Sequence, residues 1–451
     1  MSDLAALAGR AVEATLAAGA GDAEAYASEE AGREIRVHGG EVESLTAATQ
    51  RGVGVRAWIG GRVGYAYGTD SSEAGIATLA ARAAEAANAA DEDEFAGAPQ
   101  ADGAAPALDG LSDPSLAQWP AGDAAELALA VERTALAADS RIVGVEQAVY
   151  VDSADRVAIA SSTGVAGSYE SSTCYAYLQA LAESGAGRET GLGFGLARGP
   201  AGLDPEAIGR EGAERAVAMI GAGKPASRSC PVVLDPTVAA SFIGLIGAAL
   251  AASAVQRGRS PFAERLGAEV ASESLVLHDD GLDPGGLGSA PFDGEGVARR
   301  RSALIEDGYL QAFLYDTYTA RRGAAASTGS AGRAGYRSLP SVATSNLTVA
   351  TGSLSFEQLL AEAADGVYVT DVAGLHSGVN PVTGVFSVGA SGRTIAGGEL
   401  AEPVREFTIA SDLVSMLRAV RAAGAQARWV PFGGSVLTPE LLVGEMTVSG
   451  S

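Results

Sequence analysis

The sequence predicts an α+β protein in which a duplicated N-terminal α-β(antiparallel)-α domain, residues 1–222, is followed by a C-terminal α+β domain, residues 223–451, with a large mixed or barrel-like sheet. Two observations predict this fold. The order helix, several strands, helix occurs twice before residue 222, although the two copies share little sequence. A linker at 221–229 then separates this pattern from a new series of strand and helix signals.

The first repeat begins with an amphipathic helix at 3–19 and ends with an alanine-rich helix that Ser71 or Ser72 caps and that reaches about Ala90. Glycine pairs at 39–40 and 60–61 predict tight hairpins, because such turns need a positive φ. The expected short antiparallel strands are 23–28, 32–38, 41–49, 52–58 and 62–67.

The second repeat follows an acidic linker rich in Ala, Gly and Pro that starts at Asp91 and lies near 91–120. It begins with a helix at about 121–138 and ends with a helix for which Asp204 is the N-cap and Pro205 the first-turn proline. Between the two helices, the strand-like segments are 142–152, 156–161, 164–183 and 188–197.

The C-terminal domain starts with a short buried strand at 230–234, and Asp235-Pro236 then begins an uncharged helix. Asp307-Gly308 predicts a hairpin, and Ser355 with Gln358 predicts a capping box for a helix that Gly366 ends. The remaining expectations are strands at 346–351 and 367–372, mostly turns at 374–392, a helix from Ser411 to about Gly424, and closing strands at 435–437 and 445–448.

Composition excludes some classes of function. A formal net charge of −24 makes nucleic acid a poor partner, because phosphate binding relies on Lys and Arg. Residues 237–255 carry no charge, but twelve of the nineteen are Ala, Gly, Ser or Thr, which favours a buried helix over a membrane span. With only two cysteines and no signal-peptide pattern at the N-terminus, we expect a cytoplasmic protein.

Residues 277–322 concentrate ionisable groups and glycines, and they supply the first candidates for catalysis or metal binding, His278, Asp279 and Asp280. Adjacent residues of an extended segment point to opposite faces, so these three cannot easily converge on one ion. The alternative is a turn at the end of a strand with solvated carboxylates. The glycines at 281–288 do not form a phosphate loop, because no Lys-Ser or Lys-Thr follows them.

Other candidates lie further along the chain. His376 could be a general base or ligand, although a lone histidine in a loop is more often neither. Asn380 could hydrogen-bond a peptide backbone. Arg299 and Arg300 could pair with a carboxylate of a substrate or partner, or form a solvated face, and Tyr315 is a further substrate-binding candidate. Of the two cysteines, Cys230 is expected in the core, and Cys174 is a weak candidate nucleophile because no histidine lies near it in sequence.

Several long segments together resemble the TldD/PmbA family, once called modulators of DNA gyrase, and within it the PmbA (TldE) branch. The resemblance covers nearly the whole length. It implies a heterodimeric TldD/TldE protease that processes unfolded or extended peptides in an enclosed chamber, with a metal on an HExxxH helix of the TldD-type subunit and a cysteine ligand nearer that subunit's C-terminus. The segments are CPVVLDPTVAASF at 230–242, HDDGLDPGGLGSAPFDGEGV at 278–297, IEDGYLQAFLYDTYTAR at 305–321, GVNPVTGVFSVGASG at 378–392 and VGEMTVSG at 443–450, with 41–67 as a further match.

The chain departs from this family pattern where the metal is expected. The helix after Asp235-Pro236 has no His, Glu, Asp or Cys from 237 to 259, and residues near Gly244, Leu245 and Ala249 stand where ligands and base are expected. No cysteine follows Cys230. Because zinc needs three or four donors at about 2 Å, we expect no metal or other cofactor in this chain and zinc only in a TldD-type partner.

These observations predict a metal-free PmbA/TldE-type subunit, inactive alone, that pairs with a TldD-type metallopeptidase and helps to hold an unfolded peptide. Two alternatives stay open at this point. One is a self-sufficient hydrolase that uses His278, Asp279 and Asp280, or His376. The other is a homodimeric peptide-binding protein without catalysis.

Overall fold

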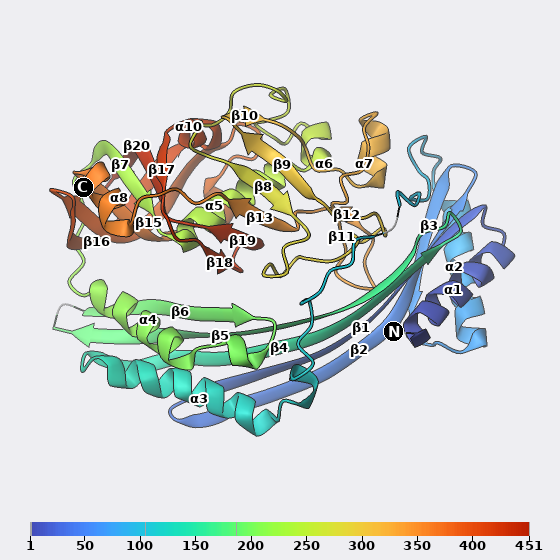
Figure 1. The fold of residues 1–451 in the computed structure, drawn as a ribbon, viewed down its shortest axis with the longest axis horizontal. Helices are drawn as coiled ribbons and strands as arrows, with labels where there is room; N and C mark the ends of the chain where they lie inside the picture. The colour runs from blue at the N-terminus through green and yellow to red at the C-terminus, as the bar shows by residue number, and fades with distance from the viewer. Residues whose placement is uncertain (1, 104, 186, 451) are drawn as a thin grey trace.

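The N-terminal part of the chain forms a long curved sheet. Helices cover its outer face, and the C-terminal unit packs against its concave face (Figure 1). The computed structural model describes residues 2–103, 105–185 and 187–450. The sheet has six antiparallel strands in the order β3-β2-β1-β4-β5-β6, so the first strands of the two repeats meet in its middle.

The duplication is confirmed by the order of the elements. The first repeat consists of α1 (Ser2–Ala17), β1 (Asp22–His38), β2 (Glu41–Ile59), β3 (Arg62–Gly68) and α2 (Glu73–Ala89). The second consists of α3 (Ala121–Ala138), β4 (Ile142–Ser161), β5 (Ala166–Ser184), β6 (Gly187–Ala197) and α4 (Pro205–Ala218), with the 3-10 turns η1 (Leu116–Gln118) and η2 (Pro200–Gly202) before α3 and α4.

The strands are longer than predicted, which corrects the sequence analysis. The predicted strands 23–28 and 32–38 are one strand, β1, and the breaks expected near residues 50 and 154 are also absent from β2 and β4. The cause is tertiary: β1 pairs with β4 without interruption from Glu24 opposite Ser161 to Val37 opposite Ala148, so the ladder holds the intervening residues extended. The predicted hairpins are correct, with positive φ at all four glycines of 39–40 and 60–61.

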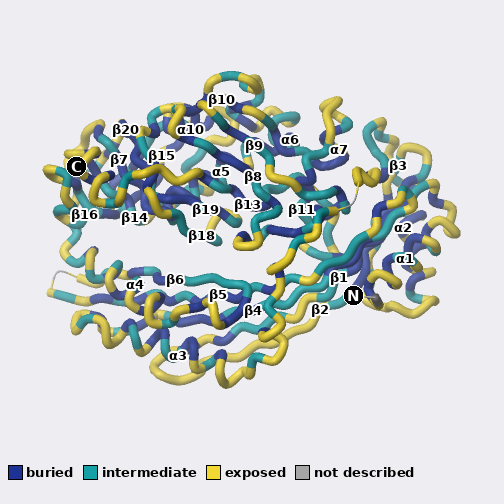
Figure 2. Tube along the Cα trace, viewed as in Figure 1, coloured by how far each residue is buried: buried dark blue, intermediate teal, exposed yellow. Residues whose placement is uncertain are grey.

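Small side chains bring the helices close to the sheet. Alanines of β1 meet Leu4 and Leu7 of α1 in one buried cluster, and α3 and α4 form a second cluster over β4 and β5. Gly191 and Gly193 of β6 lie so close to the α4 backbone that a Cβ would collide with it. The helices of the two repeats thus cover separate ends of one face (Figures 1 and 2).

The C-terminal unit contains a closed barrel. Its five strands are β7 (Arg228–Leu234), β14 (Gly366–Ala373), β15 (Val385–Ala396), β16 (Glu399–Asp412) and β20 (Leu441–Ser449), and pairing between β16 and β20 closes it. The short strand β17 (Val420–Ala423) adds to β20. This agrees with the predicted barrel-like sheet.

A second, open sheet completes the unit, with α5 (Pro236–Ala249) packed between it and the barrel. Its order is β10 (Tyr309–Leu310), β9 (Arg301–Glu306), β8 (Leu277–Asp280), β13 (Asn346–Val349), β19 (Ser435–Thr438) and β18 (Arg428–Val430). The remaining elements are the hairpin β11 (Ala331–Gly332) and β12 (Ser341–Val342) and the helices α6 (Ala252–Gln256), α7 (Thr317–Arg322), α8 (Phe356–Ala363), α9 (Leu375–Gly378) and α10 (Leu413–Arg418).

Two C-terminal predictions are wrong. The last helix begins after Asp412, whose side chain accepts from the Ser415 amide, and it ends at Arg418 because β17 follows and pairs with β20. Eight of the nineteen residues of 374–392, a segment predicted as mostly turns, belong to β15. The uncharged segment 237–255 divides into the buried helix α5 and the short α6, and no helix in the described part of the chain is long and apolar enough to cross a membrane.

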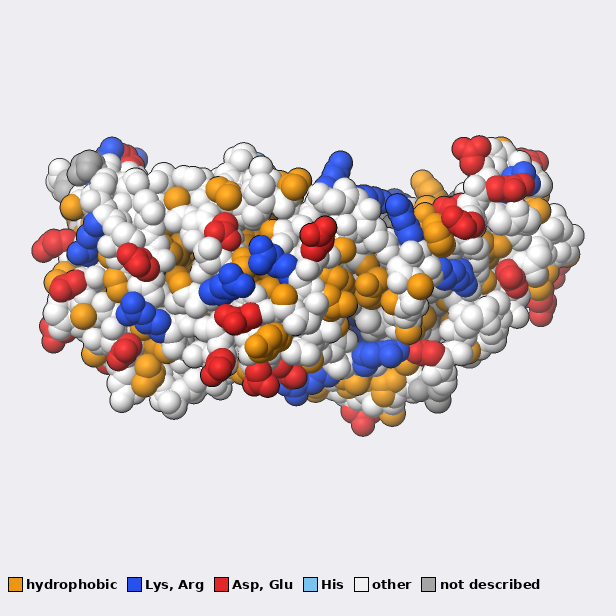
Figure 3. Space-filling view, turned by 90° about the horizontal axis from the view of Figure 1, so that it is seen from above, with side chains coloured by type: hydrophobic (Ala, Val, Ile, Leu, Met, Phe, Trp, Pro, Cys, Tyr) orange, Lys and Arg blue, Asp and Glu red, His pale blue; other side chains and the backbone are white. Residues whose placement is uncertain are grey.

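The C-terminal unit is fastened to the sheet through buried ion pairs. Glu24 of β1 pairs with Arg56 of β2 and also, at 3.0 Å, with Arg333 of the C-terminal unit. Arg56 in turn reaches Glu295 of that unit at 3.0 Å. Glu24 is 0% exposed and Arg56 7%, so two cations and two anions offset one another away from water. Basic and acidic side chains elsewhere are interspersed over the face in Figure 3.

Candidate functional site

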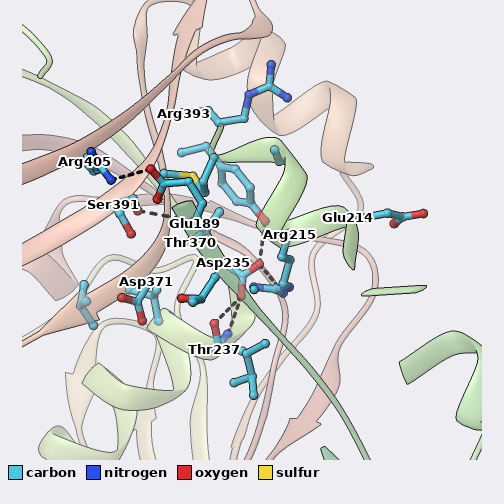
Figure 4. Close-up of a pocket in the computed structure, with 18 of the residues that line it drawn as sticks. Glu189, Glu214, Arg215, Asp235, Thr237, Thr370, Asp371, Ser391, Arg393 and Arg405 are labelled. Carbon is cyan, nitrogen blue, oxygen red and sulfur yellow. Dashed lines mark hydrogen bonds and ion pairs between the residues drawn. The ribbon is translucent and has the colours of Figure 1, made fainter. Parts of the chain in front are cut away.

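A cavity of about 700 Å³ lies between the second repeat and the C-terminal unit, at the end of the sheet opposite the buried ion pairs (Figures 1 and 4). Strands β5 and β6 and helix α4 form one wall. Barrel strands and the start of α5 form the other. The lining residues are Gln179, Glu189, Thr190, Gly191, Leu192, Glu214, Arg215, Ala218, Met219, Asp235, Thr237, Val238, Ser241, Tyr368, Thr370, Asp371, Val372, Ser391, Arg393, Leu400, Arg405 and Phe432.

Asp235 organises one side of this cavity. It is the N-cap of α5, and its Oδ1 accepts from the Thr237 amide at 2.9 Å and the Thr237 hydroxyl at 2.6 Å. Its Oδ2 accepts from Arg215 Nη2 at 3.0 Å and from the Tyr368 hydroxyl at 2.7 Å (Figure 4). Burial, together with the Asp235 charge, raises the pKa of Tyr368, so the phenol stays protonated and donates.

The opposite side carries an ion pair that water can reach. Arg405 of β16 pairs with Glu189 of β6, and its side chain is 39% exposed. Arg393 donates to the Ala401 carbonyl rather than to an acid. Burial raises the pKa of Asp371 at the rim. The cavity is thus polar on both walls, with Leu192, Val238 and Phe432 supplying apolar surface.

The first turns of α5 reach the cavity through Thr237, Val238 and Ser241, none of which is a zinc ligand of the family type. Beyond them, a Cβ on Gly244 would lie 2.5 Å from the Gly433 carbonyl oxygen, so backbone occupies the space that a ligand side chain would need. Leu245 and Ala249 pack against the apolar core. In the described ranges, no three His, Cys, Asp or Glu residues are grouped to hold a metal. The residues of this helix do not fit the metal that the family resemblance implies.

The candidates on β8 point in different directions, as their adjacency predicts. His278 Nε2 lies 2.7 Å from Glu306 Oε1, and its Nδ1 lies 3.2 Å from Arg301 Nη2. Asp279 is buried and accepts from the amide and hydroxyl of Ser345, and burial raises its pKa to about 6. Asp280 accepts from the Leu282 amide. These contacts lie within the C-terminal unit and away from the cavity.

The other predicted site residues are also dispersed. His376, on α9, is exposed, and Asn380 accepts from the amides of Val382 and Thr383 in its own turn. Arg300 pairs with Asp102 at 2.8 Å. Arg299 is partly buried, and two of its nitrogens have no hydrogen-bond partner in the described structure. Tyr315 packs against the apolar core. Roles for the eight candidates stay predictions, and none of the eight lines the cavity.

In the sequence, Asp235 is recognisable only as the start of a helix. Arg215 and Tyr368 join it from α4 and β14, and neither residue carries a local motif. The one available signal was the N-cap itself, because a capping aspartate has a second oxygen free for other partners. The cavity therefore arises from tertiary structure alone.

Models of the PmbA/TldA metallopeptidase domains match most of the chain: domain 1 at residues 23–87, the central domain at 114–220 and the C-terminal domain at 227–450. The metalloprotease PmbA of Escherichia coli O157:H7 is 31% identical over 435 residues, which cover 95% of this chain and 93% of that protein. A metalloprotease PmbA homolog of Haemophilus influenzae is 28% identical and covers 98% of this chain and 95% of its own length.

Solved structures share the fold. TldE from Thermococcus kodakarensis superposes with a TM-score of 0.90 at 21% identity, covering 97% of this chain and 99% of that one. A putative modulator of DNA gyrase from Thermotoga maritima gives a TM-score of 0.89 at 24% identity and covers 98% of this chain and 99% of its own. At such low identity, these likenesses establish the fold and the closed barrel beside a curved sheet.

Proposed function

Because this chain belongs to the PmbA/TldD metallopeptidase family, we propose that it is the metal-free, PmbA/TldE-type subunit of a TldD/TldE-like metalloprotease that processes unfolded or extended peptides. The observation that carries the proposal is helix α5, which lies beside a cavity but has no side chain able to bind zinc. A partner subunit then cleaves the peptide, and this chain helps to bind it.

The cavity supports peptide binding by strand addition. Strand β6 is the last strand of the long sheet, and residues 189–192 of it line the cavity. An extended peptide beside a sheet edge gains backbone hydrogen bonds without a requirement for sequence, and flanking pockets take its side chains. The volume of about 700 Å³ lies in the range of natural binding pockets.

The proposal is tested by mixing this chain with a TldD-type metallopeptidase from the same organism and following cleavage of an unfolded, fluorescently labelled peptide. We expect a stable complex whose activity a chelator removes, and no cleavage by this chain alone. Chelator-sensitive cleavage by the purified chain alone would show that the proposal is wrong.

The role of the cavity is tested separately with Thr190→Arg, which places a long charged side chain in it. The matched control is Thr351→Arg at an exposed position elsewhere. We expect the first variant to assemble normally but to cleave at least about tenfold more slowly, because a substrate displaced by about 1 Å can lose about a hundredfold in rate. Equal activity of the two variants would show that the cavity does not bind the peptide.

A double variant separates the proposal from a self-sufficient hydrolase. His278→Ala with His376→Ala removes both histidines of the C-terminal unit. The proposal expects the mixed complex to keep its peptidase activity, whereas a hydrolase centred on either histidine would lose it.

A further inference from the structure

One arginine of the C-terminal unit keeps two buried nitrogens without a partner. Arg299 follows the bridge between Phe292 and Ala298, and Gly281 leaves room for its stem, because a Cβ there would lie 2.8 Å from Arg299 Cδ. At the end of the stem, Nε and Nη1 are buried and have no hydrogen-bond partner among the described residues. Leaving the donors of a buried cation unsatisfied is costly, so this guanidinium suits a ligand that accepts hydrogen bonds.

Three other arginines at the contact between the C-terminal unit and the sheet are satisfied. Arg56 pairs with two glutamates. Arg333 has one buried nitrogen without a partner, but it pairs with Glu24 at 3.0 Å. Arg198 donates to three backbone carbonyls. Arg299 differs from all three, because within the described ranges neither a carboxylate nor a carbonyl accepts from its guanidinium.

Two buried carboxyls lie near Arg299 but do not bond to it. Burial raises the pKa of Asp279 to about 6 and that of Asp293 to about 7, and the charge of Arg299 offsets only part of each rise. Asp279 accepts from Ser345, and Asp293 accepts from three backbone amides. Because both carboxyls are partly protonated near neutral pH, they balance the arginine charge incompletely, which favours an anionic ligand.

The sheet places a hydroxyl beside this charge. The ring of Tyr169 on β5 meets Phe292 edge to face, with ring centroids 5.2 Å apart. Burial raises the pKa of Tyr169, and the charge of Arg299 opposes the rise, so the phenol is protonated at neutral pH and able to donate. Asp155 of β4 is the acid on this face of the sheet that also acts on Tyr169, and burial raises its own pKa to about 6.

We propose that Arg299 binds a carboxylate at the contact between the C-terminal unit and the sheet, with Tyr169 as a second donor. A planar guanidinium presents parallel N–H groups that match the two oxygens of a carboxylate. The ligand is either the C-terminus of a bound peptide or a small free carboxylate. Arg299 does not line the cavity beside α5, so this site is additional to it. Only the peptide source rests on the proposed function.

Titration of the full chain with isotope-labelled acetate, followed by NMR, tests the proposal. We expect saturable binding in the millimolar range, while neutral acetamide should not bind. Arg299→Gln should raise the dissociation constant for acetate at least about tenfold, and Arg299→Lys should raise it less, because lysine keeps the charge without the planar fork. Arg259→Gln, at an exposed position of the same unit, is the matched control and should bind like the wild type.

Two results of this titration would overturn the proposal. One is wild-type binding of acetate no tighter than that of acetamide, and the other is an unchanged dissociation constant in Arg299→Gln. Near-UV circular dichroism checks that the variants are folded. If Arg299→Gln does not fold, Arg299→Lys decides, and a dissociation constant equal to that of the wild type would then overturn the proposal.

A pair of labelled unfolded peptides separates the two sources of the carboxylate. Both lack Asp and Glu, and one ends in a free carboxylate whereas the other ends in an amide. If the peptide supplies the ligand, the free acid should bind this chain at least about tenfold more tightly, and Arg299→Gln should abolish the difference. Equal binding of the two peptides, with acetate bound, assigns the site to a free carboxylate. Absence of any peptide binding would count against the proposed function and leave the acetate result in place.

Discussion

The two ends of the contact between the sheet and the C-terminal unit are built differently. At the end formed by β1 and β2, Arg56 and its partners are buried and bridge the two units. At the cavity end, Arg215 and Asp235 also bridge the two units, with side chains 24% and 4% exposed, but a second bridging pair, Arg405 with Glu189, has an arginine that is 39% exposed. Breaking a buried pair leaves an unpaired charge in a low-dielectric interior, whereas a solvated pair rearranges at little cost. Both ends therefore hold the units together, and the outer pair at the cavity end is the one that can rearrange beside a ligand.

The largest expected effect comes from breaking the buried end. Arg56→Met keeps an unbranched apolar stem but removes the cation between Glu24 and Glu295. We expect the free energy of unfolding to fall by about 3–5 kcal/mol, the usual cost of leaving a buried charge unpaired. Urea denaturation measures this loss. Arg133→Met, which removes an exposed pair with Glu126, should leave the midpoint nearly unchanged, and equal effects of the two variants would contradict the comparison.

A pH titration examines a buried carboxyl in the C-terminal unit. Burial raises the pKa of Asp279 to about 6, so between about pH 4 and pH 6 the folded chain holds a proton that the unfolded chain releases. Its contribution to stability therefore falls as the pH rises through this window, by on the order of 3 kcal/mol in total. Asp279→Asn, whose oxygen can still accept from Ser345, should remove the share of this slope that Asp279 contributes, while Asp293, whose pKa burial raises to about 7, keeps its own share. Denaturation midpoints from pH 4 to pH 8 measure it, and parallel profiles would be the contrary result.

The packing of α5 is expected to have an intermediate effect. Gly244→Ala places a Cβ against the Gly433 carbonyl, and overpacking of this kind costs about 1–3 kcal/mol. Gly9→Ala is the matched control, because α1 has open space there and alanine favours a helix. Thermal unfolding should show a lower midpoint for the first variant and an equal or higher midpoint for the second. A neutral Gly244→Ala would mean that the space beside α5 is free for a ligand side chain.

The smallest effect is expected at the cavity end. Arg405→Met removes the solvated partner of Glu189, and we expect less than about 1 kcal/mol of lost stability. Urea denaturation of both variants, Arg405→Met and Arg56→Met, compares the two losses of stability directly. A loss as large as that of Arg56→Met would show that both ends fasten the units equally.

Much of the fold follows from local signals. Ser72, Asp204 and Asp235 cap helices through the bonds that their side chains predict, and Asp307-Gly308 forms its hairpin with positive φ at both residues. These features depend on a few neighbouring residues. The length of β1 depends instead on β4, more than a hundred residues away, and no local pattern contains that information.

The candidate site was less accessible to sequence reasoning. The absence of zinc ligands from α5 can be read directly from its residues, but the cavity that this helix borders cannot. It needs Arg215, Asp235 and Tyr368 to meet from three elements. Conversely, the conspicuous acids and histidine of β8 are engaged with local partners. A concentration of ionisable residues in a short segment therefore did not predict which residues line the cavity, because that depends on where each element lies in the fold.

The pairing of β1 with β4 has a consequence for folding during synthesis of the chain. Arg33 and its partner Asp152 on the two strands are 119 positions apart. At a synthesis rate of about 5–20 residues per second, the first repeat waits on the order of ten seconds after its own completion before β4 emerges from the ribosome. During that interval both β1 and residues 41–50 of β2 expose unpaired edges, which can recruit other strands until the rest of the sheet forms.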